Sequence, residues 1–257
     1  MVSLRDVVRS AVIWAGFAGV VVLAVPPMLF GYPLVVVDPN RALSDWYFRR
    51  LARLVVGVNP FWRVTVDGKD KLRTGGPFVI VVNHQSLTDL IAMCFLDHPS
   101  KYLGKKAAFD VPIFGWALRI AGEIPVVRGD RASGAAAVEK LGAWLERGVS
   151  VTIFPEGTRS EDGSLGAFKH GAFRLAIAHG RPIVPVVLTG AHDLLPKGSI
   201  VFKRRAEIRV TVLDPIPTHG LTEDDVPALT DRTHEAMRSA LAGQPLGIRS
   251  TGSVRPG

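Results

Sequence analysis

The first forty residues are almost continuously apolar. No charged side chain occurs between Arg9 and Asp38, and the stretch up to Val25 is apolar on every helical face. Roughly 20 such residues cross the hydrocarbon core of a bilayer as an α-helix. Pro26-Pro27 interrupts the run, and because proline removes helical hydrogen bonds we expect a bend there. The pattern predicts an N-terminal helical membrane anchor.

Basic residues flank this run on both sides: Arg5, Arg9, Arg41, Arg49, Arg50 and Arg53. Arginine and lysine mark the cytoplasmic side of a membrane segment. A single span would place one basic flank on the wrong side, so we favour a re-entrant hairpin at the cytoplasmic face of the inner or plasma membrane. A full span, a cleaved signal peptide and a buried core helix are the alternatives. Four aromatic residues are expected near the headgroups: Trp46, Tyr47, Phe48 and Trp62.

After residue 60 the pattern changes to short apolar strands that alternate with amphipathic helices. Strands are expected at 64–66, 77–83, 102–103, 124–127, 149–154, 183–188 and 208–213, and helices at 86–96, 113–120, 133–146, 168–178 and 223–241. This alternation predicts an α/β fold with a mixed central sheet flanked by helices. We therefore divide the chain into an anchoring segment with a hairpin and an interfacial helix (1–58), an α/β domain (59–242) and a disordered tail (243–257).

Composition narrows the class of protein. The 257 residues are 47% hydrophobic, which is ample for one well-buried core. The formal net charge of +8 indicates an anionic partner such as a phosphorylated substrate, a membrane surface or nucleic acid. The single cysteine, Cys94, excludes an internal disulfide and reads as a small core residue.

A histidine and a carboxylate follow the strand that ends at Val82. The sequence Asn-His-Gln-Ser-Leu-Thr-Asp places His84 and Asp89 five positions apart. Histidine can remove a proton near neutral pH, and a carboxylate on its other ring nitrogen would fix the tautomer. The alternative is a helix capping box from Ser86 to Asp89, in which the carboxylate serves only the helix N-terminus.

A polar turn follows the strand that ends at Phe154. The sequence Phe-Pro-Glu-Gly-Thr-Arg brings Glu156 and Arg159 into a glycine-containing turn. An arginine on such a turn can grip a phosphate through paired hydrogen bonds. Taken alone, the segment could equally be an ordinary polar turn.

Together and in this order, the two motifs resemble the glycerolipid acyltransferase family, in particular the 1-acylglycerol-3-phosphate O-acyltransferases. The resemblance runs from about Pro77 to Val187. With these as the first and third family blocks, Ile124–Asp130, which contains Arg128, resembles the second block and Ile183–Leu188 the fourth. Phe168–Phe173 also matches the family's segment after the third block.

The resemblance implies direct acyl transfer without an acyl-enzyme. His84, held by Asp89, would take the proton from an acceptor hydroxyl that attacks a thioester carbonyl. The remaining residues would bind substrate: Arg128 and Arg159 at the acceptor phosphate, Glu156, Gly157 and Thr158 around the glycerol, and Lys105, Lys106 or Lys169 as weaker candidates that could equally be surface residues. The donor would be acyl-coenzyme A or acyl carrier protein, the acceptor lysophosphatidic acid and the product phosphatidic acid, with no cofactor or metal.

Other readings stay open. The same chemistry could use glycerol 3-phosphate or the sugar of a glycolipid as acceptor. A non-catalytic lipid-binding protein is a further alternative, although the presence of both His84 and Asp89 argues against it. A serine hydrolase is disfavoured because the sequence has no Gly-x-Ser-x-Gly, and it has no P-loop either. Nucleic-acid binding would explain the charge but not the apolar N-terminal run.

Overall fold

The protein has a mixed α/β fold, as the sequence predicts. The structure, a computed structural model, describes residues 4–57, 62–127, 129–195, 197–202 and 206–243. In this part of the chain seven strands form one sheet in the order β1-β7-β6-β2-β5-β3-β4. All neighbouring strands are parallel except β6 and β7, which are antiparallel.

The strands lie close to the expected positions. They are β1 (Trp62–Asp67), β2 (Val79–Val82), β3 (Ser100–Lys105), β4 (Ile124–Val126), β5 (Ser150–Ile153), β6 (Ile183–Thr189) and β7 (Ala206–Val212). The helices of the α/β domain are α4 (Asp89–Met93), α5 (Lys106–Phe109), α6 (Phe114–Ala121), α7 (Arg131–Glu146), α8 (Gly171–Ala178), α9 (Ala191–Leu194) and α10 (Val226–Ala242), with short 3₁₀ turns at Lys69–Leu72, Cys94–Leu96 and Glu223–Asp225.

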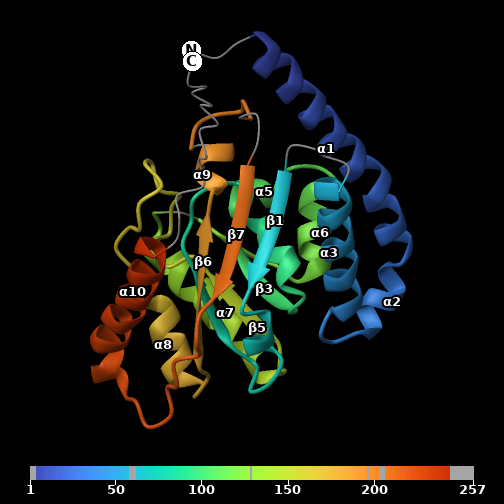
Figure 1. Cartoon of the computed structure of the whole chain (residues 1–257). Helices are drawn as coiled ribbons and strands as arrows, with labels where there is room; N and C mark the ends of the chain where they lie inside the picture. Colours follow the sequence, from blue (N-terminus) through green and yellow to red (C-terminus); the bar gives the residue numbers. More distant parts are fainter. Residues whose placement is uncertain (1–3, 58–61, 128, 196, 203–205, 244–257) are drawn as a thin grey trace, which may run out of the picture.

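Helices cover both faces of the sheet, so its central strand, β2, is buried on both sides. All four residues of β2 are fully buried. Ile80 and Val82 pack in the core shared with α4, whereas Val79 and Val81 pack in the core shared with α7, α8 and α10. This alternation is the two-residue period of a strand. Figure 1 shows α8 and α10 on one side of the sheet and α3 with α1 on the other.

The N-terminal segment is helical throughout, in three pieces. These are α1 (Leu4–Phe30), α2 (Tyr32–Val37) and α3 (Ala42–Gly57). The helix continues through Pro26 and Pro27 to Phe30, so the break lies at Gly31 rather than at the prolines. Residues Leu4–Met28 are long and apolar enough to cross a membrane, by length and composition alone.

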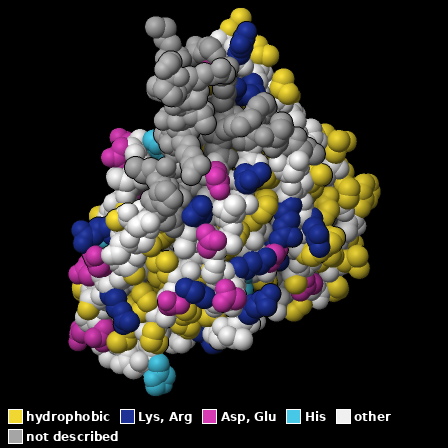
Figure 2. Space-filling view, viewed as in Figure 1, with side chains coloured by type: hydrophobic (Ala, Val, Ile, Leu, Met, Phe, Trp, Pro, Cys, Tyr) yellow, Lys and Arg dark blue, Asp and Glu magenta, His cyan; other side chains and the backbone are white. Residues whose placement is uncertain are grey.

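The exposed surface of these helices is strongly apolar. Leu23, Phe30 and Val37 are each more than three-quarters exposed, at 78%, 87% and 78%. Figure 2 shows hydrophobic side chains gathered along the side where α1 and α2 lie. Large exposed apolar patches mark contact with a membrane or another protein, so α1 is a candidate membrane anchor.

A buried ion pair ties α3 to the sheet. Lys101 of β3 is fully buried, and its Nζ lies 2.8 Å from Oδ1 of Asp45 in α3. The ammonium also lies over the ring of Trp144, 5.1 Å from its centroid. A buried charge is tolerated only with such partners, so this pair fixes where α3 lies against β3.

One of the four aromatic residues expected near the headgroups lies in the core. Trp62 was expected near the headgroups, but it is 8% exposed and packs against Phe202 in the core, because it begins β1. That expectation is wrong. The predicted disordered tail at 243–257 lies, apart from Gly243, outside the described residues.

Candidate functional site

The two sequence motifs meet because their strands are neighbours. β2 and β5 are paired in parallel, with Val81 opposite Ile153. The carboxyl ends of parallel strands lie at the same sheet edge, so the loops that follow them converge. The amide of Ser160 donates to the carbonyl of His84 at 2.8 Å, and the amide of His84 donates to Oε1 of Glu156 at 2.8 Å. The two motifs are thus bonded to each other, once between backbone groups and once through the Glu156 side chain.

His84 and Asp89 form the pair that the sequence predicts. Nδ1 of His84 lies 2.7 Å from Oδ2 of Asp89, whose side chain is fully buried. The ring of His84 stacks on Phe154, with centroids 4.3 Å apart and an interplanar angle of 30°. Nε2 of His84 has no protein partner within the described part of the chain, and the side chain lines a cavity.

One of the two hydrogen bonds of the alternative capping box is present, and it uses the Asp89 oxygen that also contacts His84. Oδ2 of Asp89 also accepts from the amides of Gln85 at 2.7 Å and Ser86 at 2.9 Å. The reciprocal bond of a capping box, from the amide of Asp89 to Oγ of Ser86, is missing, because Oγ accepts from the amide of Thr88 at 3.3 Å and the Asp89 amide points to the Ser86 carbonyl, at 3.5 Å. Asp89 therefore holds the turn and the imidazole together, and the two readings of the sequence do not exclude each other.

Asn83 fixes the start of this turn. Its Nδ2 donates to the carbonyl of Leu188 at 2.9 Å, and its Oδ1 accepts from the amide of Leu188 at 2.7 Å. This paired contact continues the β2–β6 ladder through a side chain. Asn83 belongs to the first motif in the sequence, but only the neighbouring strand reveals its structural role.

Glu156 receives two backbone hydrogen bonds. Oε1 accepts from the amide of His84, and Oε2 accepts from the amide of Gly166 at 3.1 Å. Burial raises the pKa of Glu156, and the two backbone donors offset this only in part. The carboxyl group of Glu156 thus braces the loop after β5 against the turn that carries His84.

The other expected binding residues differ in their placement. Gly157, Lys105 and Lys169 line the same cavity as His84. Thr158 is exposed and Arg159 half-exposed, and neither is among the described residues that line this cavity. Lys106 pairs with Asp110 at the surface, which agrees with its surface alternative. Arg128 lies outside the described residues.

Arg159 pairs with no carboxylate in the described residues. Glu156 is occupied by two amides, and Asp130 caps α7 by accepting from the amides of Ala132 and Ser133. Because Ser160 is bonded to the carbonyl of His84, the backbone of Arg159 lies beside the His84 turn.

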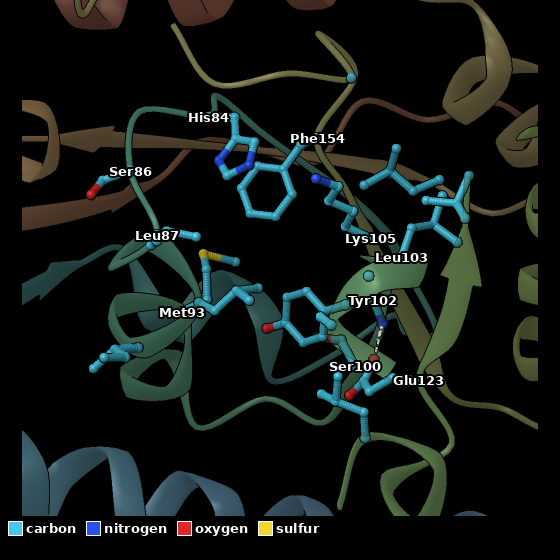
Figure 3. Close-up of a pocket in the computed structure, with 18 of the residues that line it drawn as sticks. His84, Ser86, Leu87, Met93, Ser100, Tyr102, Leu103, Lys105, Glu123 and Phe154 are labelled. Atoms are coloured by element: carbon cyan, nitrogen blue, oxygen red, sulfur yellow. Dashed lines mark hydrogen bonds between the residues drawn. The ribbon is translucent and has the colours of Figure 1, made fainter. Parts of the chain in front are cut away.

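The cavity beneath His84 is large, about 1940 Å³, and mostly apolar in its lining. Figure 3 shows His84 and Phe154 at one end and Ser100 and Glu123 at the other, with Met93 and Tyr102 between them. Side chains of α1 and α3, including Ile13, Phe17 and Phe48, also line it. The sequence did not reveal this cavity, because its walls come from elements far apart in the chain.

Glu123 is an ionisable group at the inner end of the cavity. Its Oε2 accepts from the amide of Tyr102 at 2.6 Å. Burial raises its pKa to about 8, although the charge of Lys101 acts in the opposite direction. Near neutral pH the inner end therefore holds a largely neutral carboxylic acid. Burial likewise raises the pKa of Cys94 to about 12, so this thiol has little nucleophilic character.

Known proteins resemble this chain in sequence and in fold. The family model described as Acyltransferase matches residues 63–189, which include His84 and Arg159. A chloroplastic 1-acyl-sn-glycerol-3-phosphate acyltransferase of Arabidopsis thaliana is 35% identical over 199 residues, 77% of this chain and 55% of that protein. A putative 1-acyl-sn-glycerol-3-phosphate acyltransferase of Caenorhabditis elegans is 33% identical over 75% of this chain and 69% of its own length.

The human 1-acyl-sn-glycerol-3-phosphate acyltransferase alpha is 39% identical over 179 residues, 68% of this chain and 62% of that protein. The chain spans little more than half the length of the chloroplastic relatives, 55% and 58%. Among solved structures, the 1-acyl-sn-glycerophosphate acyltransferase PlsC of Thermotoga maritima has a similar fold. Its TM-score is 0.77 at 22% identity, over 95% of this chain and 99% of that one.

The pKa of Glu123 leads to a pH-dependent prediction. Because burial raises it from 4.5 to about 8, the folded chain keeps a proton over this range that the unfolded chain loses. Stability contributed by this group is therefore lost as the pH rises from about 5 to about 8. Glu123→Gln can still accept from Tyr102 but cannot ionise, so its melting temperature should fall less than that of the wild type over this range. Equal falls in two matched series of melting curves would contradict the assignment.

Proposed function

The chain belongs to the acyltransferase family, and from this we propose that it transfers a fatty acyl group from a thioester donor to the free hydroxyl of lysophosphatidic acid. The product is phosphatidic acid. The observation that carries the proposal is the His84–Asp89 pair at the mouth of a large apolar cavity. The names of the relatives from Arabidopsis, C. elegans and human support the choice of acceptor.

His84 is the general base in this proposal. Asp89 accepts a hydrogen bond from Nδ1–H, which leaves Nε2 unprotonated and turned to the cavity. Nε2 takes the proton of the acceptor hydroxyl while the oxygen attacks the thioester carbonyl. When the tetrahedral intermediate collapses, the carbon–sulfur bond breaks, and the imidazolium returns the proton to the leaving thiolate. The Asp89 carboxylate stabilises the imidazolium between these two steps.

The apolar cavity supplies the binding energy for a hydrocarbon chain. Each buried methylene contributes about 0.8 kcal/mol of transfer free energy. Met93 and Tyr102 line the cavity below His84 (Figure 3), so a chain bound there would hold its thioester carbonyl near Nε2. The donor is acyl-coenzyme A or acyl carrier protein, which present the same thioester.

Cations around the mouth of the cavity suit an anionic acceptor. Lys105 and Lys169 line it, and Arg159 lies beside the His84 turn without a carboxylate partner in the described ranges. We assign the acceptor phosphate to Arg159, together with Arg128, and leave the two lysines as neighbouring positive charges. Glu156, Gly157 and Thr158 form the turn that presents Arg159 and would face the glycerol.

The anchor would bring the site to its lipid substrate. The apolar α1 and α2, and the basic α3, lie on one side of the molecule (Figure 1). We propose that they bind the cytoplasmic face of the membrane, with α1 and α2 as the hairpin and α3 at the interface. Residues of α1 and α3 also line the cavity, so the lipid chain need not leave an apolar environment on its way to His84.

A panel of acceptors tests the proposed activity. The purified full chain in detergent, given acyl-coenzyme A, should convert lysophosphatidic acid to phosphatidic acid, detected by mass spectrometry. His84→Ala should lower kcat by about 10²- to 10⁴-fold, whereas His219→Ala, at an exposed histidine before α10, should not change it. Faster acylation of glycerol 3-phosphate or of a phosphate-free monoacylglycerol would contradict the assigned acceptor. A His84→Ala variant with more than about half the wild-type kcat would contradict the base.

Arg159 allows a test of the phosphate site. A charge-assisted hydrogen bond contributes roughly 1.5–3 kcal/mol, so Arg159→Ala should lower kcat/KM for lysophosphatidic acid by about 10- to 100-fold. The KM for the acyl donor should change far less. Arg159→Lys should restore only part of the loss, because an ammonium lacks the planar fork. Arg232→Ala, at an exposed position of α10, is the control for loss of charge.

Steady-state kinetics with each substrate varied in turn distinguishes the outcomes for Arg159. A purely structural arginine would affect both substrates and the melting temperature alike. Equal losses for donor and acceptor would therefore remove Arg159 from the phosphate site.

A further inference from the structure

The loop between β5 and α8, residues 154–170, carries Glu156, Arg159 and Lys169 but has no helix or strand of its own. On the side of the histidine turn it is held by Ser160, whose amide donates to the carbonyl of His84, and by Gln85, whose Nε2 donates to the carbonyl of Gly163. These bonds fix its first half. The second half, from Gly163 onward, is bonded to the first half by the amide of Lys169, which donates to the carbonyl of Pro155 at 2.9 Å, and it has one further support outside the loop.

That support comes from α10, outside the region matched by the family model. Nε2 of His234 lies 3.2 Å from the carbonyl oxygen of Gly166. A carbonyl only accepts, so Nε2 must carry the donated hydrogen. The ring of His234 also meets Phe168 edge to face, with centroids 4.7 Å apart and an interplanar angle of 72°. One side chain thus contacts the loop at two points.

Gly166 connects this contact to the catalytic turn. Its carbonyl accepts from His234, while its own amide donates to Oε2 of Glu156 at 3.1 Å. The other oxygen of Glu156 accepts from the amide of His84. A Cβ on Gly166 would lie 2.9 Å from Oε2 of Glu156, closer than real Cβ contacts. A side chain at this position would therefore push the Glu156 carboxylate away from the bonds that link α10 to the His84 backbone.

His234 is presented by a rigid element. On the same helix, Leu229, Thr233 and Met237 are buried against the sheet, with exposed fractions of 4%, 0% and 0%. A helix held by buried residues on either side of position 234 cannot easily move with the loop. The hydrogen bond therefore ties the 154–170 loop, an element type that is usually mobile, to a helix packed on the core.

We propose that His234 is a positioning residue, which clamps Gly166 and Phe168 so that Glu156 holds the backbone of His84 in place. The expected effect on catalysis rests on the proposed function. The contacts of His234 with Gly166 and Phe168 do not depend on it. His234 does not touch the reacting atoms. It acts through Gly166 and Glu156 on the orientation of the His84–Asp89 pair.

Four variants of the full chain test the clamp. His234→Ala removes both contacts, His234→Gln keeps a donor for the Gly166 carbonyl, and His234→Phe keeps only a ring against Phe168. Arg238→Ala, one turn further along α10, removes a surface pair with Glu235 and is the matched control. A hydrogen bond of ordinary net strength corresponds to roughly a 3- to 10-fold effect. We expect that loss in kcat/KM for His234→Ala and His234→Phe, with most of it restored in His234→Gln.

Native-state trypsin cleavage after Arg159 and Lys169 gives a readout that needs no activity. It should be roughly 3- to 10-fold faster in His234→Ala than in the wild type or Arg238→Ala, since loss of the clamp lets the loop open more often. If His234→Ala is cleaved faster and the wild-type chain transfers no acyl group, the proposed function is disproved and the clamp stands. Unchanged cleavage, or a loss of activity no larger than that of Arg238→Ala, would overturn the clamp. Rescue by His234→Phe but not by His234→Gln would overturn the hydrogen bond as its basis.

Discussion

One carboxylate oxygen, Oδ2 of Asp89, holds the candidate site together. It accepts from the imidazole of His84 and from the amides of Gln85 and Ser86, all within 2.7–2.9 Å. The two amides fix the carboxylate relative to the turn, and the carboxylate in turn fixes the ring. Because Asp89 is the first residue of α4 and is fully buried, it cannot change rotamer without breaking all three bonds. The direction of Nε2 is therefore a consequence of how the chain leaves β2.

The sheet determines what this histidine can meet. β2 lies between β6 and β5, so its loop is bonded to Leu188 through Asn83 on one side and to Glu156 and Ser160 on the other. Below the histidine, the cavity passes Met93 and Tyr102 and is completed by side chains of α1 and α3. The ion pair of Lys101 with Asp45 holds α3 against β3 beside that cavity. The anchoring helices are consequently part of the wall of the site as well as its candidate link to a membrane.

The parts of this arrangement that depend on residues close together in the chain could be predicted from the sequence. The apolar strand ending at Val82, and the polar residues directly after it, sufficed to place His84 and Asp89 at a sheet edge. The resemblance to acyltransferases, based on four blocks in order, is confirmed by the family match and the relatives. The mixed sheet is confirmed as well.

Features that depend on distant contacts could not be predicted in this way. Trp62 looked like an interfacial aromatic, but it is buried at the start of the edge strand β1, which pairs with β7, more than 140 residues away in sequence. The helix through Pro26 and Pro27 continues for about one further turn, and the helical structure is interrupted only at Gly31. Glu123 and His234 carry no motif at all, and their importance appears only from Tyr102, Gly166 and Phe168 packed against them.

The central claim, that the Asp89 carboxylate orients and supports His84 as the base, is tested most directly by Asp89→Asn. An amide oxygen can still accept from Gln85 and Ser86, so the turn should persist and the melting temperature should stay close to that of the wild type. The negative charge beside the imidazolium is lost, so kcat should fall by roughly 10²-fold or more, as in comparable histidine–aspartate pairs. A variant with unchanged stability and more than about half the wild-type kcat would show that Asp89 only shapes the turn, and would contradict the account.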